Sequence, residues 1–109
     1  MDDTGHIVVL ITAGTETEAQ RIRDLLLQAR QAACVNILPK MNSTYWWQGR
    51  LESAEEHLLI VKTMASRLKA VIDLAKQNHS YKVPEIIAMP IVGGNPDYLT
   101  WIDKEVCTE

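Results

Sequence analysis

The chain has 109 residues, 47% hydrophobic and 23% charged, which is the composition of one globular domain spanning 1–109 and not of a disordered protein. Eleven basic residues against fourteen acidic ones give a net charge of −3, and the basic residues are scattered, which argues against a nucleic-acid partner. The chain has no CxxC pair, which argues against a zinc ribbon and a dithiol redox protein. It has neither a basic start followed by an apolar leader nor an apolar run long enough to span a bilayer, so we expect a cytoplasmic protein.

The first third of the chain predicts a strand followed by a helix. Residues 6–13 form a continuous β-branched run, typical of a strand buried on both faces. Apolar residues then recur with helical period, which predicts a helix over about 16–31. Thr15 and Glu18 have the spacing of a capping box at its start, and we expect Glu18 to face water.

The middle of the chain predicts a long β-hairpin. A strand over 33–38 is expected to break at Pro39, and extended structure resumes over 41–47. A glycine-containing turn at 48–50 then leads into a second strand over 52–63.

A second helix and a fourth strand follow the hairpin. Helical spacing covers 65–78, with Ser66 as the expected N-cap, and a loop precedes a strand over 86–92. Pro90 lacks an N–H group, so that strand is expected at a sheet edge or a bulge.

The end of the chain predicts a third helix. Asn95 is suited to the N-cap and Pro96 to the first helical position of a helix that continues over 97–106. The resulting order is βαββαβ plus a final helix, which predicts an α+β, ferredoxin-like sandwich with both main helices on one face of an antiparallel sheet.

The other face of such a sheet needs a cover. The runs 7–11 and 58–61 are apolar on both sides, so one apolar face is left open to water. Self-association through this face and through the long hairpin is the simplest solution, with Tyr45, Trp46 and Trp47 as interface anchors. The alternative is that the terminal helix, with Trp101, folds over the face.

Several segments together resemble the CutA family of divalent-cation tolerance proteins. The resemblance runs from about Ile7 to Trp101 and is carried by AACVNILP (32–39), STYWWQGRLE (43–52), HSYKVPEII (79–87) and GNPDYLTW (94–101). It implies a ferredoxin-like fold, a compact homotrimer similar in architecture to PII-type signalling trimers, a cytoplasmic setting and a role in metal-ion tolerance.

The resemblance also implies a possible copper site. In the copper-binding members the ligands are a first-strand cysteine and two adjacent histidines before the loop tyrosine, positions that are Ile11, Asn78 and His79 here. The family commonly has His-Pro-Tyr-Glu where this chain has a serine after His79 and Lys82 after the tyrosine. Only His79 is retained as a candidate metal ligand, and no obligatory cofactor is expected.

The remaining histidines and cysteines have structural interpretations. His57 is expected to pack or hydrogen-bond at the start of an apolar strand, and His6 to be solvated. Cys34 is expected to be a small buried hydrophobe, and Cys107 to lie near a frayed terminus without an activated thiolate. His79 itself is either structural or a weak ligand for a divalent metal such as copper.

Bulky and charged residues from separate segments predict a ligand pocket between subunits, lined by Tyr45, Trp47, Lys62, Tyr81, Glu85 and Trp101. The sequence shows no set of a nucleophile, a base that activates it and a third residue that orients the base, so we do not expect an enzyme. Three functions stay open: a trimeric binding or regulatory module for divalent-cation tolerance, a scaffold trimer without metal chemistry, and an enzyme acting on a small metabolite in the pocket. We expect neither nucleic acid nor membrane as a partner.

Overall fold

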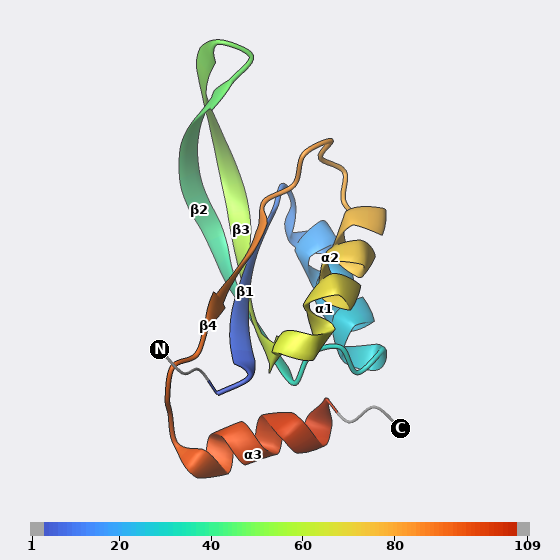
Figure 1. Ribbon diagram of the computed structural model, residues 1–109. Helices are drawn as coiled ribbons and strands as arrows, with labels where there is room; N and C mark the ends of the chain where they lie inside the picture. The colour runs from blue at the N-terminus through green and yellow to red at the C-terminus, as the bar shows by residue number, and fades with distance from the viewer. Residues whose placement is uncertain (1–3, 107–109) are drawn as a thin grey trace.

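Four strands and three α-helices follow one another along residues 4–106, the part of the chain that the computed structural model describes (Figure 1). Their bounds are β1 His6–Ala13, α1 Glu16–Gln28, β2 Cys34–Trp47, β3 Arg50–Met64, α2 Leu68–Gln77, β4 Ile86–Pro90 and α3 Pro96–Glu105. The predicted order of elements is confirmed. The expectation for Cys107 lies outside the described residues.

The four strands form one antiparallel sheet in the order β2-β3-β1-β4. β1 and β3 are the central strands, with one face of each buried under the helices and the other apolar but only partly buried on the open face. β4 is an edge strand, and Pro90 pairs with Ile7 at its end, as the missing N–H group predicts.

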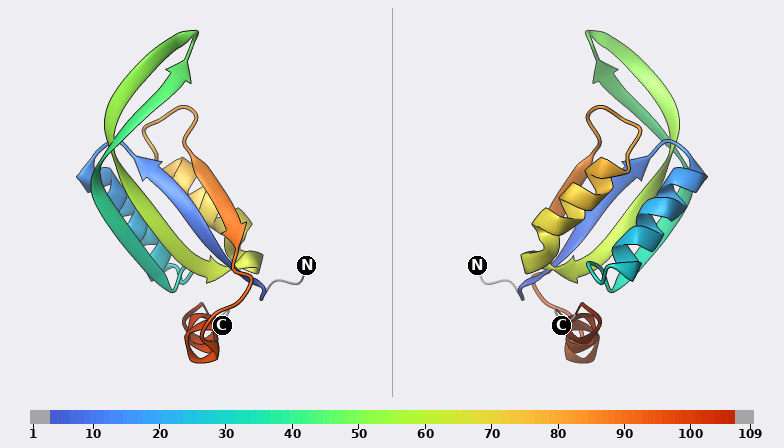
Figure 2. Two further views of the ribbon diagram at one scale, coloured as in Figure 1. Left: turned by 90° about the vertical axis from the view of Figure 1, so that its left-hand side faces the viewer. Right: turned by 90° about the vertical axis from the view of Figure 1, so that its right-hand side faces the viewer.

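α1 and α2 lie together on one face of the sheet (Figure 2). Between them and the sheet, alternate strand residues and one stripe of each helix form the core. Val9, Ile11, Leu26 and Leu59 have no exposed surface. Burying each such side chain is worth about 1.5–3 kcal/mol, so this layer is the main source of stability.

α1 begins as predicted but ends earlier than residue 31. Thr15 is the N-cap, and its Oγ1 accepts a hydrogen bond from the Glu18 N–H at 3.1 Å. At the other end Arg30 has φ 58°, and the Gln31 N–H donates to the Leu26 carbonyl at 2.9 Å. These are the marks of a left-handed C-terminal cap, which stops the helix at Gln28.

The expected break at Pro39 is a bulge within one strand. β2 continues from Cys34 to Trp47, and its register against β3 shifts between Leu38 and Met41. Lys40 has φ 59°, and its N–H donates to His57 Nδ1 at 3.3 Å, which confirms the prediction of a hydrogen-bonded His57. The bulge bends the hairpin away from the rest of the sheet.

The hairpin extends well beyond the helices (Figure 1). It closes through Gln48 and Gly49, whose φ values of 51° and 80° fit a type I′ turn between strands that twist right-handedly. Residues near its tip are largely exposed: Trp46 is 70% and Leu51 61% accessible, although the two are paired across the strands.

The caps of the two later helices differ from each other. Ser66 does not cap α2, because residues 65–67 form a 3₁₀ turn that leads directly into the helix without a side-chain cap. Asn95 caps α3 as predicted, and its Oδ1 accepts from the Asp97 N–H at 3.0 Å. None of the helices within residues 4–106 is long and apolar enough to span a membrane.

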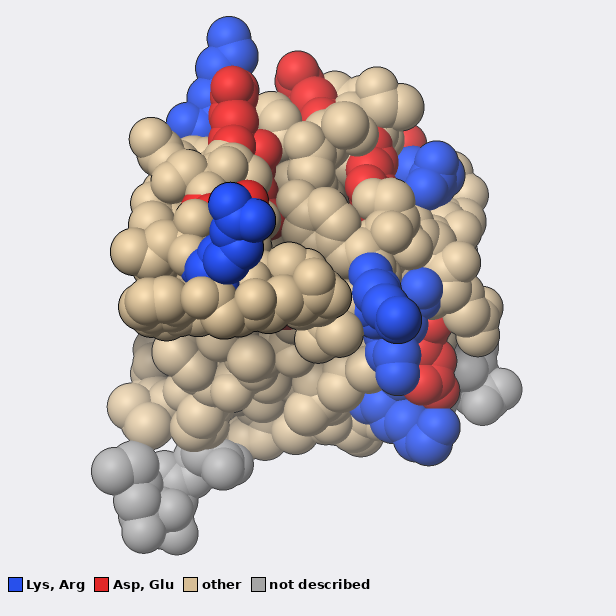
Figure 3. Space-filling view, turned by 90° about the horizontal axis from the view of Figure 1, so that it is seen from above, with Lys and Arg blue, Asp and Glu red and all other residues tan. Residues whose placement is uncertain are grey.

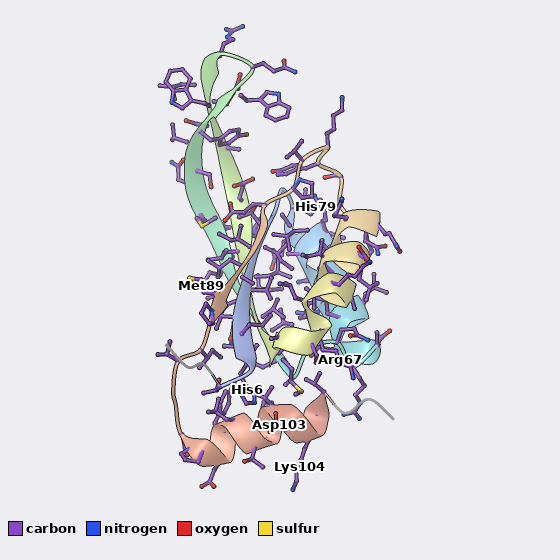
Figure 4. All side chains as sticks on the ribbon, in the orientation of Figure 1. His6, Arg67, His79, Met89, Asp103 and Lys104 are labelled. Carbon is purple, nitrogen blue, oxygen red and sulfur yellow. The ribbon has the colours of Figure 1, made fainter. Side chains whose placement is uncertain are left out.

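α3 lies beyond the end of the sheet and does not cover its open face (Figure 2). It is held there by Asp103, whose Oδ1 lies 2.7 Å from His6 Nε2, and the two are neighbours in Figure 4. His6 is 7% exposed, so the expectation of a solvated histidine is wrong. Trp101 contacts Tyr98 in the same helix, with ring centroids 5.5 Å apart.

The face opposite the helices is open and apolar. The strand register sets Leu10 beside Ile60 and Ile87 on this face, with Leu38 and Met89 further along the same surface. Three of these side chains remain about half exposed: Leu38 49%, Ile87 52% and Met89 47%. Cys34 belongs to the same face through its pairing with Lys62 and is partly exposed, so the prediction of a buried cysteine is wrong.

Candidate functional site

The loop between α2 and β4 folds back onto the end of β1, and His79 anchors it there. The His79 side chain has no exposed surface. Its Nε2 lies 2.6 Å from the Thr12 carbonyl oxygen, and its Nδ1 accepts from the Tyr81 N–H at 3.0 Å. These partners fit the neutral ring with the proton on Nε2.

Glu18 is the second anchor of this loop. Its carboxylate accepts two hydrogen bonds from Ser80, from the backbone N–H at 2.6 Å and from Oγ at 2.8 Å, and lies 3.2 Å from His79 Nδ1. Glu18 is 5% exposed, so the expectation that it faces water is wrong. The sequence held a signal: Glu18 precedes Ile22 and Leu26 at intervals of four, which places it on the buried stripe of α1.

The anchored loop directs Tyr81 toward the hairpin. The Tyr81 hydroxyl donates to Glu56 Oε2 at 2.9 Å. Burial raises the pKa of Tyr81 to about 12, and the hydrogen bond to Glu56 and the charge of that carboxylate add to the rise. Gly14 leaves room for the ring, because a Cβ atom there would lie 2.9 Å from the hydroxyl oxygen.

An open pocket of about 520 Å³ lies between the outer part of the hairpin, beyond the bulge, and the anchored loop. This volume suits a small organic ligand. The pocket is lined by Thr12, Ser43, Thr44, Tyr45, Trp47, Glu56, Tyr81, Lys82, Val83 and Glu85.

Four of the six residues expected in an intersubunit pocket line this one: Tyr45, Trp47, Tyr81 and Glu85. The other two lie elsewhere in the chain. The Lys62 ammonium donates to Asn36 Oδ1 on the open face of the sheet. Trp101 belongs to α3, beyond the opposite end of the sheet.

Sequence reasoning did not assign Glu56 and Ser43 to the pocket. Ser43 could have been found, because it shares the alternate positions of Tyr45 and Trp47 on one face of β2. Glu56 could not, because its position depends on the register of β3 after the bulge and on a loop 25 residues away in sequence.

The pocket carries more acidic than basic groups. Glu56 is 6% exposed and Glu85 is exposed, whereas Lys82 is the single basic residue in the lining. Seen from the hairpin end, acidic and basic side chains are interspersed on a largely uncharged surface (Figure 3). A tyrosine hydroxyl is protonated at neutral pH, and the raised pKa of Tyr81 extends this to higher pH, so the hydroxyl serves as a donor to Glu56.

The residues around His79 do not fit a resident copper or zinc ion. Such ions take three or four soft or imidazole ligands. Within residues 4–106 no three His, Cys, Asp or Glu side chains are grouped so that they could hold a metal ion. Both ring nitrogens of His79 face hydrogen-bond partners, and a metal would have to displace one of them.

Comparison with known proteins gives one family. The sequence profile described as CutA1 divalent ion tolerance protein matches residues 7–105. A rice protein, Protein CutA 1, chloroplastic, of Oryza sativa subsp. japonica, is 45% identical over 96 residues, which make up 88% of this chain and 54% of the rice protein. The chain thus spans about half the length of that plant relative.

Solved structures share the architecture over nearly the whole chain. The periplasmic divalent cation tolerance protein CutA of Archaeoglobus fulgidus has a TM-score of 0.90 and 44% identity, with 93% of this chain and 98% of that one covered. CutA of Xylella fastidiosa has a TM-score of 0.93 and 38% identity, with 95% and 100% covered. The four-stranded antiparallel sheet with three helices is therefore common to these proteins.

Proposed function

The chain belongs to the CutA1 divalent ion tolerance family, and from this premise we propose that it is a homotrimeric binding module that contributes to divalent-cation tolerance without catalysing a reaction. The observation that carries the proposal is the pocket between hairpin and loop, in which the loop anchored by His79 and Glu18 places Tyr81 against Glu56. Such a site is suited to bind a ligand and to report its presence.

The trimer is supported by the open face of the sheet. A sheet whose side chains Leu38, Ile87 and Met89 are half exposed gains stability when a second copy covers it, at roughly 25 cal/mol per Å² of apolar surface. The strand order β2-β3-β1-β4 in a βαββαβ chain supports the ferredoxin-like assignment, and with it the likeness to PII-type trimers.

Light scattering at micromolar concentration tests the trimer. We expect a mass three times the 12.3 kDa of the chain. Replacing Ile87 and Met89 together by lysine should dissociate it, because two charges then lie on the covered face. The matched control places two lysines at the exposed positions Gln20 and Gln28 of α1. A stable folded monomer of the unmodified chain refutes the trimer.

We further propose that no metal cofactor is obligatory, and that copper or another divalent ion is the stress to which the protein responds. Weak binding through His79 stays a prediction, which calorimetric titration of copper and zinc into the wild-type chain and His79→Ala tests. Equal heats of metal binding for the two proteins would show that His79 is not a metal ligand. A cytoplasmic location also stays a prediction, since the rice relative is described as chloroplastic and the Archaeoglobus protein as periplasmic.

The role in tolerance is tested by growth of a strain that lacks the gene, across a series of copper and zinc concentrations. Expression of the wild-type chain should restore growth, and the Gln20 and Gln28 control should do the same. The Ile87 and Met89 double variant should fail if the trimer is required. Restoration by that variant, once it is shown to be monomeric, contradicts the proposal. Growth that the wild-type chain does not restore contradicts the link to tolerance altogether.

A further inference from the structure

We propose that the pocket between hairpin and loop binds a small organic ammonium ion, held between Tyr45, Trp47 and Tyr81 and balanced by Glu56 and Glu85. The inference deepens the proposed binding function and rests on it, because it names the ligand class of the same pocket.

Aromatic rings form the walls of the pocket. Tyr45 and Trp47 are alternate residues of β2, so their side chains stand on one face about 7 Å apart. In the single chain they are 39% and 42% exposed, so ring surface is left over for a ligand that sits between the hairpin and the loop. Tyr81 adds a ring from the loop side. An alkylammonium group within about 6 Å of such rings is attracted by their negative faces, and its methyl or methylene groups are in turn buried against them.

Negative charge lies at the inner end of the pocket. The Glu56 carboxylate is nearly buried, and the Tyr81 hydroxyl occupies one acceptor site of Oε2. A carboxylate has about four such sites, so Glu56 can accept further hydrogen bonds from an ammonium N–H or attract a quaternary ammonium. Glu85 adds a second carboxylate at the rim. Both charges attract a cation at short range, and the nearly buried Glu56 is screened less by water than the exposed Glu85.

The lining distinguishes an organic cation from the other ligand classes. A bare metal ion needs more ligands, and among residues 4–106 no group of three His, Cys, Asp or Glu side chains can hold one. An anion would meet two carboxylates and only one ammonium group, that of the exposed Lys82. A neutral ligand would leave the nearly buried charge of Glu56 with the hydrogen bond from Tyr81 but without a neutralising cation beside it.

Calorimetric titration of the trimer with tetramethylammonium chloride tests the inference, with sodium chloride at equal ionic strength as the baseline and tert-butanol as a neutral ligand of similar shape. We expect saturable binding of tetramethylammonium and none of tert-butanol. In parallel, the indole N–H resonance of Trp47, assigned with Trp47→Phe, should shift with the same concentration dependence.

Two substitutions should change the affinity for tetramethylammonium in opposite directions. Glu56→Gln should weaken tetramethylammonium binding about fivefold, because one nearby charge is removed. The matched control Glu55→Gln, the preceding residue of β3 with its side chain on the other face, should leave binding unchanged. Lys82→Met should strengthen binding about twofold, since a repelling charge is lost. Because Lys82 is exposed, Lys82→Met should fold, and its effect can be measured even if Glu56→Gln fails to fold.

The inference is overturned by any of three results: no saturable tetramethylammonium binding, equal affinity for tert-butanol, or weaker binding by Lys82→Met, as an anion site requires. Failure of the inferred ligand class can be distinguished from failure of the proposed function. If the same sample has the mass of a trimer and the gene restores metal tolerance, only the ligand class is wrong. If the sample is monomeric, the proposed function itself is wrong.

Discussion

Replacement of Glu18 by alanine perturbs the contact on which the arrangement of the pocket depends. The carboxylate is 5% exposed and accepts two short hydrogen bonds from Ser80, and it is the contact that joins α1 to the loop carrying Tyr81. Without it, the Ser80 N–H and hydroxyl lose a charged acceptor, and the loop keeps its contacts through His79 and Tyr81 but loses the one through Glu18.

The expected loss is about 3 kcal/mol in the free energy of unfolding. A hydrogen bond to a charged group contributes about 1.5–3 kcal/mol, and Glu18 accepts two of them. The lower end of the range applies because Ser80 is exposed, so water can solvate its freed groups. For a domain of this size, about 3 kcal/mol corresponds to a fall of about 12 °C in Tm.

The assay is urea unfolding at one fixed trimer concentration, since the apparent stability of an oligomer depends on concentration. Glu16→Ala is the matched control: it removes an exposed carboxylate from the same helical turn, so it loses the favourable interaction with the helix dipole but no contact with the loop. Hydrogen exchange of the Tyr81 amide should rise in Glu18→Ala only. Equal destabilisation by the two variants refutes the reasoning.

Three further predictions concern single contacts. Gly14→Ala should cost about 1–3 kcal/mol because its Cβ would lie 2.9 Å from the Tyr81 hydroxyl, whereas Gly93→Ala, with nothing within 4 Å, should be neutral in urea unfolding. The Tyr81 pKa is raised in the folded state to about 12, so its contribution to stability is complete below pH 10 and lost between pH 10 and 12. The tyrosinate absorbance that appears near pH 12 should shrink in Tyr81→Phe, while Tyr45 and Tyr98 supply the remainder; an unchanged absorbance there contradicts this. Asp103→Asn should speed hydrogen exchange in α3, because the link to His6 is weakened; unchanged exchange assigns the docking of α3 to its apolar contacts alone.

Local sequence patterns predicted the elements well, and the misses share one cause. The caps Thr15 and Asn95 act on their own neighbours, so they could be found from the sequence. His6 could not be judged as exposed or buried, because its partner Asp103 lies 97 residues away in the chain. For Glu18 the spacing from Ile22 and Leu26 indicated burial, but its partner Ser80, 62 residues away, could not be found from the sequence. Cys34 was misjudged for a related reason, since the sheet register decides which face it belongs to.

The candidate site was only partly predictable. Aromatic residues and Glu85 stand out in the sequence by type, and four of the expected six line one pocket in the structure. Lys62 and Trp101 were grouped with them by type as well, but the register and the path of α3 carry them to other parts of the molecule.

The sequence by itself determined the order of strands and helices, the apolar character of both sheet faces and the family to which the chain belongs. These depend on periodicity, caps and motifs that act within a few residues. The tertiary structure alone decided that Glu18 and His79 are buried anchors and that Tyr81 meets Glu56. The physical reason is that burial and hydrogen bonding between distant residues follow from how α1, the hairpin and the loop pack together, which no local pattern encodes.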